Sequence, residues 1–212
     1  ANRSEVYTDG EKTATYDAAL TAAGCEKAAA FVNFCNAFEI PVLTLVNVDG
    51  YKNCKCNEKK IAKAAARLTY AFANADVPKV TVVVGKANGT AGLTMNSKSI
   101  GSDIVYAWKN AKIGVMEAAP ANGLGAGAKS EVGERAAEES ADEIAKADDS
   151  VALINEKAAA YREMQSSALA AAKRGYVDDI IEASETRQRV VAAFEMLFTK
   201  REDRPSKKHG TI

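Results

Sequence analysis

Histidine is nearly absent from this 212-residue sequence, which contains it once, at His209 in a basic tail. A general base or a zinc site built on histidine is therefore not predicted, and His209 is expected to be a surface or interface residue. Tryptophan also occurs only once, and Trp108 is most simply a core or interface residue. No Ser-His-Asp, Cys-His or Walker arrangement can be assembled from the residues present.

Cysteine is scarce as well. The four cysteines, Cys25, Cys35, Cys54 and Cys56, are too few and too unevenly spaced for a disulfide framework in a chain of this length. We therefore expect a reducing compartment, the cytoplasm. The Cys54-x-Cys56 pair has no second pair of ligands to complete a zinc site, so no metal centre is predicted. The first residues lack the basic-then-apolar layout of a signal peptide, which also favours the cytoplasm.

Neither sign of charge dominates, because 28 Lys and Arg residues balance 28 Asp and Glu residues. Such a chain has no electrostatic footprint for nucleic acid or for an acidic membrane surface. No apolar run approaches the roughly 20 residues that a membrane-spanning helix needs. We expect neither a nucleic-acid partner nor a membrane span. The length suits one α/β unit better than two domains.

Helix and strand patterns alternate along the sequence, which predicts an α/β fold. Residues 1–23 are interpreted as an edge hairpin or an irregular lead-in. The expected order is then helix, strand, helix, strand and helix, at about residues 25–38, 42–48, 61–72, 77–84 and from 90 onward. The helices are long enough to connect parallel neighbouring strands.

Apolar residues at helical spacing predict the face that each of the first two helices buries. These residues are Phe31, Phe34, Cys35 and Phe38 in the first helix, and Ile61, Ala65, Leu68 and Phe72 in the second. The strand at residues 42–48 is rich in valine and leucine and is expected to be buried. The strand at residues 77–84 has no polar face and is therefore expected to be covered on both sides.

Two short strands are expected at Ile104–Trp108 and Ile113–Met116, joined by a hairpin-like turn at Lys109-Asn110. Residues 118–149 then contain four glycines and few large apolar side chains. This composition predicts a low-complexity, partly disordered segment within one domain that spans residues 1–212.

The C-terminal part is predicted to return to regular structure. A helix is expected to resume near Ser150, followed by a last strand at Gly175–Ile181 and a helix with Ser184 as its N-cap. Asp178 and Asp179 are adjacent and would point to opposite faces of that strand. They are therefore interpreted as a solvated pair at a strand end rather than as paired catalytic carboxylates.

The sequence KVTVVVGKANGTAGLTMNSK, residues 79–98, is the most informative stretch. Its valine run stops at Gly85, and a turn of small residues leads into a helix expected near Thr90. Gly85, Gly89 and Gly92 allow a sharp turn and a close approach to the backbone. The first amides of that helix would be unpaired and able to hold a phosphate or an oxyanion. The GxxxGxxG spacing matches neither a P-loop nor a dinucleotide fingerprint, and a tight packing turn is the alternative interpretation.

A family resemblance rests on four stretches of the sequence. They read CEKAAAFVNFCNAFEIPVLTLVNVDGY, KIAKAAARLTYAFANADVPKVTVVVGKANGTAG, TMNSKSIGSDIVYAW and AAAKRGYVDDIIEASETRQRVVAAFEMLFTKRED. In order and spacing, they closely resemble the C-terminal half of carboxyltransferase subunits of biotin-dependent acyl-CoA carboxylases and decarboxylases, such as propionyl-CoA carboxylase β subunits. The resemblance covers residues 24–117 and 150–212. It implies a crotonase-like ββα spiral and a site shared between the N-terminal half of one subunit and the C-terminal half of its partner.

By this resemblance, amides of the glycine turn bind the ureido oxygen of biotin. The implied catalytic residues are Thr90 and Ala91, and the implied cofactor-binding residues are Gly89, Thr90, Ala91 and Gly50. Prealigned amides suit this chemistry because they stabilise charge on an oxygen without an ionisable side chain. The resemblance implies biotin on a separate carrier protein, since no lysine in an Ala-Met-Lys-Met setting is present. It also implies an acyl-CoA substrate, an N-terminal carboxyltransferase half as partner, and a homo- or hetero-oligomer.

The sequence departs from the family near the implied site. Asn88 and Gly92 stand where relatives usually have aromatic residues, and Lys109 and Glu117 replace a usual proline and glycine. Two functions stay open. One is the carboxybiotin-side half of a carboxyltransferase that moves a carboxyl group between biotin and a short-chain acyl-CoA. The other is a noncatalytic structural or interaction relative, or a fragment, that keeps the crotonase-like fold without activity.

Overall fold

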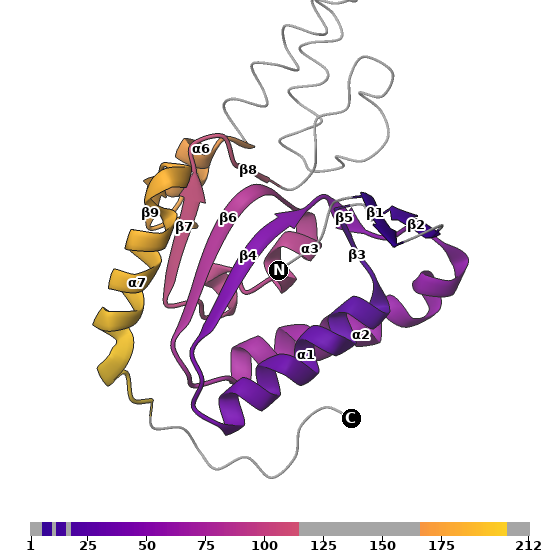
Figure 1. The fold of residues 1–212 in the computed structure, drawn as a ribbon, viewed down its shortest axis with the longest axis horizontal. Helices are drawn as coiled ribbons and strands as arrows, with labels where there is room; N and C mark the ends of the chain where they lie inside the picture. The colour runs from indigo at the N-terminus through magenta and orange to yellow at the C-terminus, as the bar shows by residue number, and fades with distance from the viewer. Residues whose placement is uncertain (1–5, 10–11, 16–17, 115–165, 203–212) are drawn as a thin grey trace, which may run out of the picture.

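A parallel five-stranded sheet forms the centre of the molecule (Figure 1). The computed structural model describes residues 6–9, 12–15, 18–114 and 166–202. The strands are β4 (Val42–Val48), β6 (Lys79–Asn88), β7 (Ile104–Trp108), β8 (Lys112–Gly114) and β9 (Asp179–Ile181). Their order is β4-β6-β7-β9, and β8 pairs with β6. Every pairing in this sheet is parallel, which confirms the α/β prediction.

Helices cover both faces of the sheet (Figure 1). Helices α1 (Ala22–Ala37) and α2 (Lys55–Asn74) lie side by side on one face, and α7 (Thr186–Met196) lies on the other. The side chains of β6 alternate between these layers: Val83 joins the core under α1 and α2, whereas Val80 and Val82 pack with residues of α7. The prediction that this strand is covered on both sides is confirmed.

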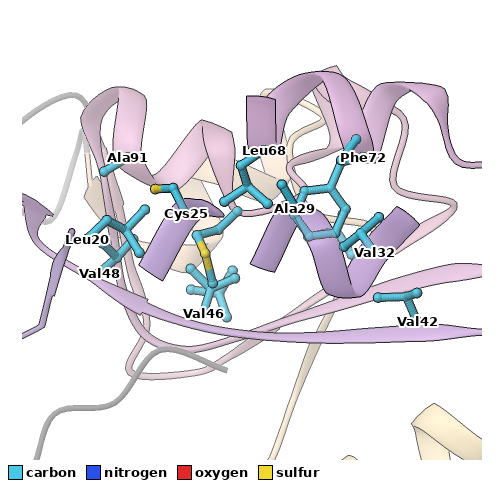
Figure 2. Close-up of a cluster of buried hydrophobic side chains, with 14 of the residues drawn as sticks. Leu20, Cys25, Ala29, Val32, Val42, Val46, Val48, Leu68, Phe72 and Ala91 are labelled. Carbon is cyan, nitrogen blue, oxygen red and sulfur yellow. The ribbon is translucent and has the colours of Figure 1, made fainter. Parts of the chain in front are cut away.

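The larger core lies between α1, α2 and β4 (Figure 2). Leu68 and Phe72 of α2 are buried in it and Ile61 packs against it, so the face predicted for this helix is confirmed. Helix α1 begins after Thr21, whose hydroxyl accepts a hydrogen bond from the Gly24 amide at 3.0 Å. This is an ordinary N-cap, which satisfies one of the amides that the helix start leaves without a partner.

The predicted face of α1 is right for Cys35 but wrong for the three phenylalanines. Phe31, Phe34 and Phe38 have 60%, 55% and 65% of their surface exposed. The buried residues of this helix are smaller ones: Ala22, Cys25, Ala29, Val32 and Cys35. Both sets have helical spacing, but consecutive residues are about 100° apart around the axis, so Phe31 and Val32 point in different directions. The helix packs through its small residues and leaves the phenylalanines outside.

Smaller elements complete the described fold. Strands β1 (Val6–Asp9) and β2 (Lys12–Thr15) form an antiparallel hairpin, as expected for the lead-in, and β3 (Ala19–Leu20) pairs with β5 (Gly50–Tyr51). The remaining elements are α3 (Gly89–Thr94), α6 (Ala168–Lys173) and the 3-10 turns η1 (Lys98–Ile100), η2 (Ala183–Glu185) and η3 (Leu197–Thr199). Among the described residues, no helix has both the length and the apolar character to span a membrane.

Two boundaries differ from the prediction. Strand β6 does not stop at Gly85 but continues to Asn88, because β4 still pairs with it at Ala87 and β8 pairs with residues 86–88. The hairpin expected at Lys109-Asn110 is also wrong. Strands β7 and β8 both run parallel to β6, one beside its first half and the other beside its end.

The C-terminal predictions are partly corrected. Ser184 lies inside η2 and is not the N-cap of α7, which begins at Thr186. Asp178 and Asp179 are both exposed, as predicted, but the Asp178 carboxylate also accepts hydrogen bonds from the Lys98 ammonium group at 2.7 and 2.8 Å and from the Val105 amide at 2.8 Å. The segment 118–149, the helix expected near Ser150, Glu117 and His209 lie outside the described residues.

Candidate functional site

The predicted glycine turn lies where the longest strand of the sheet ends. Strand β6 ends at Asn88, and α3 begins at Gly89. Gly89 has a φ of 58°, in the left-handed region that glycine enters without a steric penalty. The carboxyl ends of parallel strands are where open α/β sheets place their binding sites. The structure therefore brings Gly89, Thr90 and Ala91 together at a position suited to a ligand.

The first amides of α3 are donors without an acceptor inside the helix. The residue at the N-cap position, Asn88, does not cap them with its side chain. Instead, the Asn88 side-chain amide donates to the Asp49 carboxylate at 3.3 Å. Because α3 has only six residues, its dipole adds little, and any anion would be held by the amides themselves.

Residues around the turn hold it in place. Ala91 is only 1% exposed and belongs to the same buried cluster as Leu20 and Val48 (Figure 2). The Thr94 hydroxyl donates to the Thr90 carbonyl at 2.8 Å and is bonded to the Tyr51 hydroxyl at 2.9 Å. The turn thus has the fixed geometry that prealigned hydrogen-bond donors require.

A buried polar network holds the other end of α3. Asn96 is fully buried, with a φ of 57°, and its side-chain amide donates to the Thr81 hydroxyl at 2.9 Å. That hydroxyl bonds in turn to the Asn96 carbonyl at 2.8 Å and to the Ser102 hydroxyl at 3.0 Å. Helix α3 is therefore fixed at both ends to the strand from which it starts.

Gly92 is required by the packing of α3 against β6. A Cβ atom at this position would lie 2.7 Å from the carbonyl carbon of Ala87 and 2.9 Å from its oxygen. Both atoms belong to the backbone of β6 and cannot rotate away. The alternative interpretation of the glycine spacing, a tight packing turn, thus applies to Gly92, whereas the positive φ of Gly89 and the uncapped amides beside it suit a binding turn.

A polar cluster that the sequence patterns did not predict lies beside the turn. The Lys86 ammonium group lies 3.1 and 3.2 Å from the two carboxylate oxygens of Asp49, which also accepts from Asn88. Asn88 is 4% exposed, so its polar side chain is buried beside the turn. The sequence offered one signal: Asp49 follows β4, and Lys86 and Asn88 lie near the end of the neighbouring strand β6.

The other predicted site positions lie in neighbouring elements. Gly50 belongs to β5, whose Tyr51 contacts α3 through Thr94. Lys109 is exposed and lies 3.8 Å from Glu182, so it points to solvent. The Trp108 indole N–H donates to the Thr186 hydroxyl at 2.8 Å, which gives this tryptophan a structural role between β7 and α7. Among the described residues, no three His, Cys, Asp or Glu side chains are grouped as a metal site.

Comparisons with known proteins point to one family. The family model described as "Carboxyl transferase domain" matches residues 16–212. The propionyl-CoA carboxylase beta chain of Saccharopolyspora erythraea is 44% identical over 188 residues, which are 88% of this chain and 33% of that protein. The methylmalonyl-CoA carboxyltransferase 12S subunit of Propionibacterium freudenreichii is 40% identical over 188 residues, again 88% of this chain and 33% of the relative.

Solved structures agree with this result. A crystal structure of the transcarboxylase 12S hexamer assembly, with hydrolysed methylmalonyl-coenzyme A bound, has a TM-score of 0.77 and 39% identity to this chain. The match covers 93% of this chain and 36% of that one. It confirms the expected crotonase-like α/β fold. The chain spans about a third of the length of the curated relatives that it matches.

Proposed function

Because this chain belongs to the carboxyl transferase domain family, with residues 16–212 matching the family model, we propose that it forms the biotin-side half of a carboxyltransferase. Its reaction would move a carboxyl group between biotin and a short-chain acyl-CoA. The observation that carries this proposal is the turn at Gly89-Thr90-Ala91. Its leading amides are uncapped and its conformation is fixed by the core and by Thr94.

Biotin supplies a ureido ring that carries the carboxyl group, and loss of that group leaves negative charge on the ureido oxygen. The residues present fit such a ring: the N–H groups of Thr90 and Ala91 are the donors, and Gly89, which has a positive φ, has no side chain to block the approach. Their role is to bind the oxygen more strongly as charge develops on it, which lowers the barrier. No ionisable side chain of this chain needs to transfer a proton.

The rest of the reaction would be supplied by partners. The proposal requires an N-terminal carboxyltransferase half to hold the acyl-CoA and a carrier protein to deliver biotin. A transcarboxylase 12S relative forms a hexamer, and the exposed phenylalanines of α1 would support an interface in an oligomer of this chain. The scarcity of cysteine supports the proposed location in the cytoplasm.

A noncatalytic relative is the second candidate, and the Asp49–Lys86–Asn88 cluster is the observation that favours it. This cluster puts a carboxylate and an ammonium group beside the turn, bonded to each other. A carboxylate near the turn amides would oppose the binding of a second negative charge, although Lys86 offsets part of it. In this case the turn would serve only to pack α3 against β6.

Variants that keep or remove the Thr90 amide N–H distinguish the two candidate functions. Thr90→Ala keeps this amide and is expected to have nearly full activity. Thr90→Pro removes the donor at a first-turn position, where proline is tolerated, and is expected to lower the transfer rate about 100- to 1000-fold. The assay is carboxyl transfer from carrier-bound carboxybiotin with the N-terminal half supplied, and circular dichroism checks folding.

A second variant guards against misfolding of the proline variant. Replacing Ala91 by its α-hydroxy acid analogue turns the amide into an ester, which removes the N–H but keeps the side chain and the backbone shape. Full activity in either folded variant would remove that residue as an oxyanion donor. If the unmodified chain shows no transfer at all under these conditions, the noncatalytic candidate holds.

A further inference from the structure

Two thiols at the start of α2 have no part in the proposed reaction. Cys54 precedes the helix with an extended backbone, and Cys56 lies in its first turn. Their Sγ atoms are 2.9 Å apart. A disulfide bond is about 2.05 Å long, so the two sulfur atoms already lie within roughly 1 Å of bonding distance. Cys54 is partly exposed and Cys56 is exposed, so a reagent in solution can reach both.

The surroundings divide the two thiols into a nucleophile and a resolving partner. A hydrogen bond from the Cys56 thiol, followed by the backbone amide of Asn57, lowers the pKa of Cys54, and the charge of Lys52 acts in the same direction. The same hydrogen bond and the neighbouring thiolate raise the pKa of Cys56. The thiolate is the reactive form of cysteine, and a low pKa at the start of a helix is typical of redox-active cysteines.

The other two cysteines form an internal contrast. Cys25 and Cys35 are buried in the core between the helices and the sheet. Burial, followed by the charge of Glu26, raises the pKa of Cys25 to about 11. Neither thiol is accessible in the folded chain, so reactivity under native conditions is restricted to the pair at α2.

We propose that Cys54 and Cys56 form a reversible redox modification site, which closes to an intramolecular disulfide when a small disulfide such as oxidised glutathione is present. The Cys54 thiolate attacks one glutathione sulfur, forms a mixed disulfide and expels the other glutathione as a thiolate. The Cys56 thiolate then attacks Sγ of Cys54 and expels the second glutathione thiolate. The two cysteines lose two protons and two electrons in total, and one oxidised glutathione becomes two reduced ones.

The chain on both sides of the pair is held in place, so the disulfide ring is confined to residues 54–56. The Cys54 carbonyl accepts from the amides of Asn57 and Glu58 at 2.9 and 3.0 Å. The Asn57 side chain accepts from the Ala22 amide at 2.6 Å and donates to the Lys52 carbonyl at 2.7 Å. Closure of the ring therefore needs only a local movement and leaves the fold intact.

The test is peptide mapping by mass spectrometry. The full chain is incubated with oxidised glutathione under native conditions, and free thiols are then blocked with N-ethylmaleimide. The peptide that contains Cys54 and Cys56 is expected to lose the mass of two hydrogen atoms and to resist blocking. Dithiothreitol should restore both thiols. Cys25 and Cys35 serve as controls within the same molecule and should remain reduced.

Three variants assign the roles. Cys56→Ser is expected to stop at a stable glutathione adduct on Cys54. Cys54→Ser removes the thiol whose thiolate the Asn57 amide and the Lys52 charge favour, so it is expected to react with oxidised glutathione about tenfold more slowly than the unmodified chain. Lys55→Ala keeps both thiols and should close the ring as the unmodified chain does. An adduct that persists on the unmodified chain, a disulfide between two chains, or no reaction would each overturn the proposal.

Discussion

The glycines of the turn meet different physical requirements. Gly89 supplies a left-handed backbone conformation, with a φ of 58°. Gly92 supplies space, because the backbone of Ala87 lies where its Cβ atom would be. Only the second requirement depends on two elements that are packed together. Substitutions at these two positions are therefore expected to fail for separate reasons.

Gly92→Ala gives a prediction in which packing and helix propensity change the stability in opposite directions. Propensity alone would make alanine better than glycine by about 1 kcal/mol in a helix. The clash with the Ala87 backbone is expected to reverse this and to destabilise the chain by about 1–3 kcal/mol, as overpacking does. The measurement is the free energy of unfolding in urea.

Gly24→Ala in α1 is the matched control. Its Cβ atom would meet only the hydroxyl of Thr21, at 3.1 Å, and that side chain can rotate. The lost N-cap bond and the gained helix propensity are each about 1 kcal/mol, so a nearly neutral result is expected. A stabilising Gly92→Ala would show that α3 can move away from β6.

At the scale of whole elements, the sequence patterns predicted the order of the strands and helices but not all of their contacts. The valine run of β6 could be recognised because a strand that is buried on both faces is a continuous apolar run, without alternating polar residues. The face of α1 could not, because two stripes with the same helical spacing compete. The larger side chains, Phe31, Phe34 and Phe38, form the exposed stripe.

Contacts between residues that are far apart in the sequence could not be predicted, for a different reason. The Asp49–Lys86–Asn88 cluster near the turn and the pair between Lys98 and Asp178 depend on which strands become neighbours. A pattern within one element carries no information about the charge on another. The turn itself could be found because its glycines lie close together in the sequence.

Asp178 links three elements, and its removal gives a prediction at this scale. Asp178 lies just before β9, and its carboxylate accepts from Lys98 of η1 and from the Val105 amide of β7. Asp178→Ala would leave the Val105 amide without this acceptor, which is expected to lower the free energy of unfolding by about 1–3 kcal/mol. The exposed part of the ion pair contributes little to this figure.

The neighbouring carboxylate is the control for this prediction. Asp179 is half exposed, lies 3.7 Å from Arg189, and bonds only to the amide of the next residue, Ile180. Asp179→Ala is expected to change the stability by less than about 1 kcal/mol. Equal losses for the two variants in urea unfolding would contradict the role given to Asp178.

At the scale of the whole molecule, the last described residues are bonded to the segments that precede β6 and β7. After α7, the Lys200 ammonium group lies 2.9 and 3.0 Å from the carboxylate oxygens of Asp103 and 3.3 Å from the Val77 carbonyl. The Asp103 carboxylate also accepts from the Lys79 amide at 2.7 Å. These bonds fix the end of the chain beside the starts of β6 and β7, at the opposite end of the sheet from the glycine turn.

The phenylalanine face of α1 is exposed, and it leads to a prediction about assembly. The rings of Phe34 and Phe38 are in tilted contact, with their centroids 4.6 Å apart, and remain mostly exposed, with Phe31 on the same side of the helix. An apolar patch of this kind is typical of an interface. We expect the isolated chain to self-associate, so that light scattering at micromolar concentration gives a mass above 22.4 kDa.

The double variant Phe34→Ser, Phe38→Ser tests this directly, because both side chains lie outside the core. Each buried phenylalanine contributes about 1.5–3 kcal/mol to an interface, so the double variant is expected to weaken association at least about 100-fold. Val191→Ser on α7 removes an exposed apolar side chain from another helix, and it should leave the mass unchanged. If the unmodified chain gives only a 22.4 kDa species, or if Val191→Ser dissociates it equally well, the face of α1 is not the contact between copies.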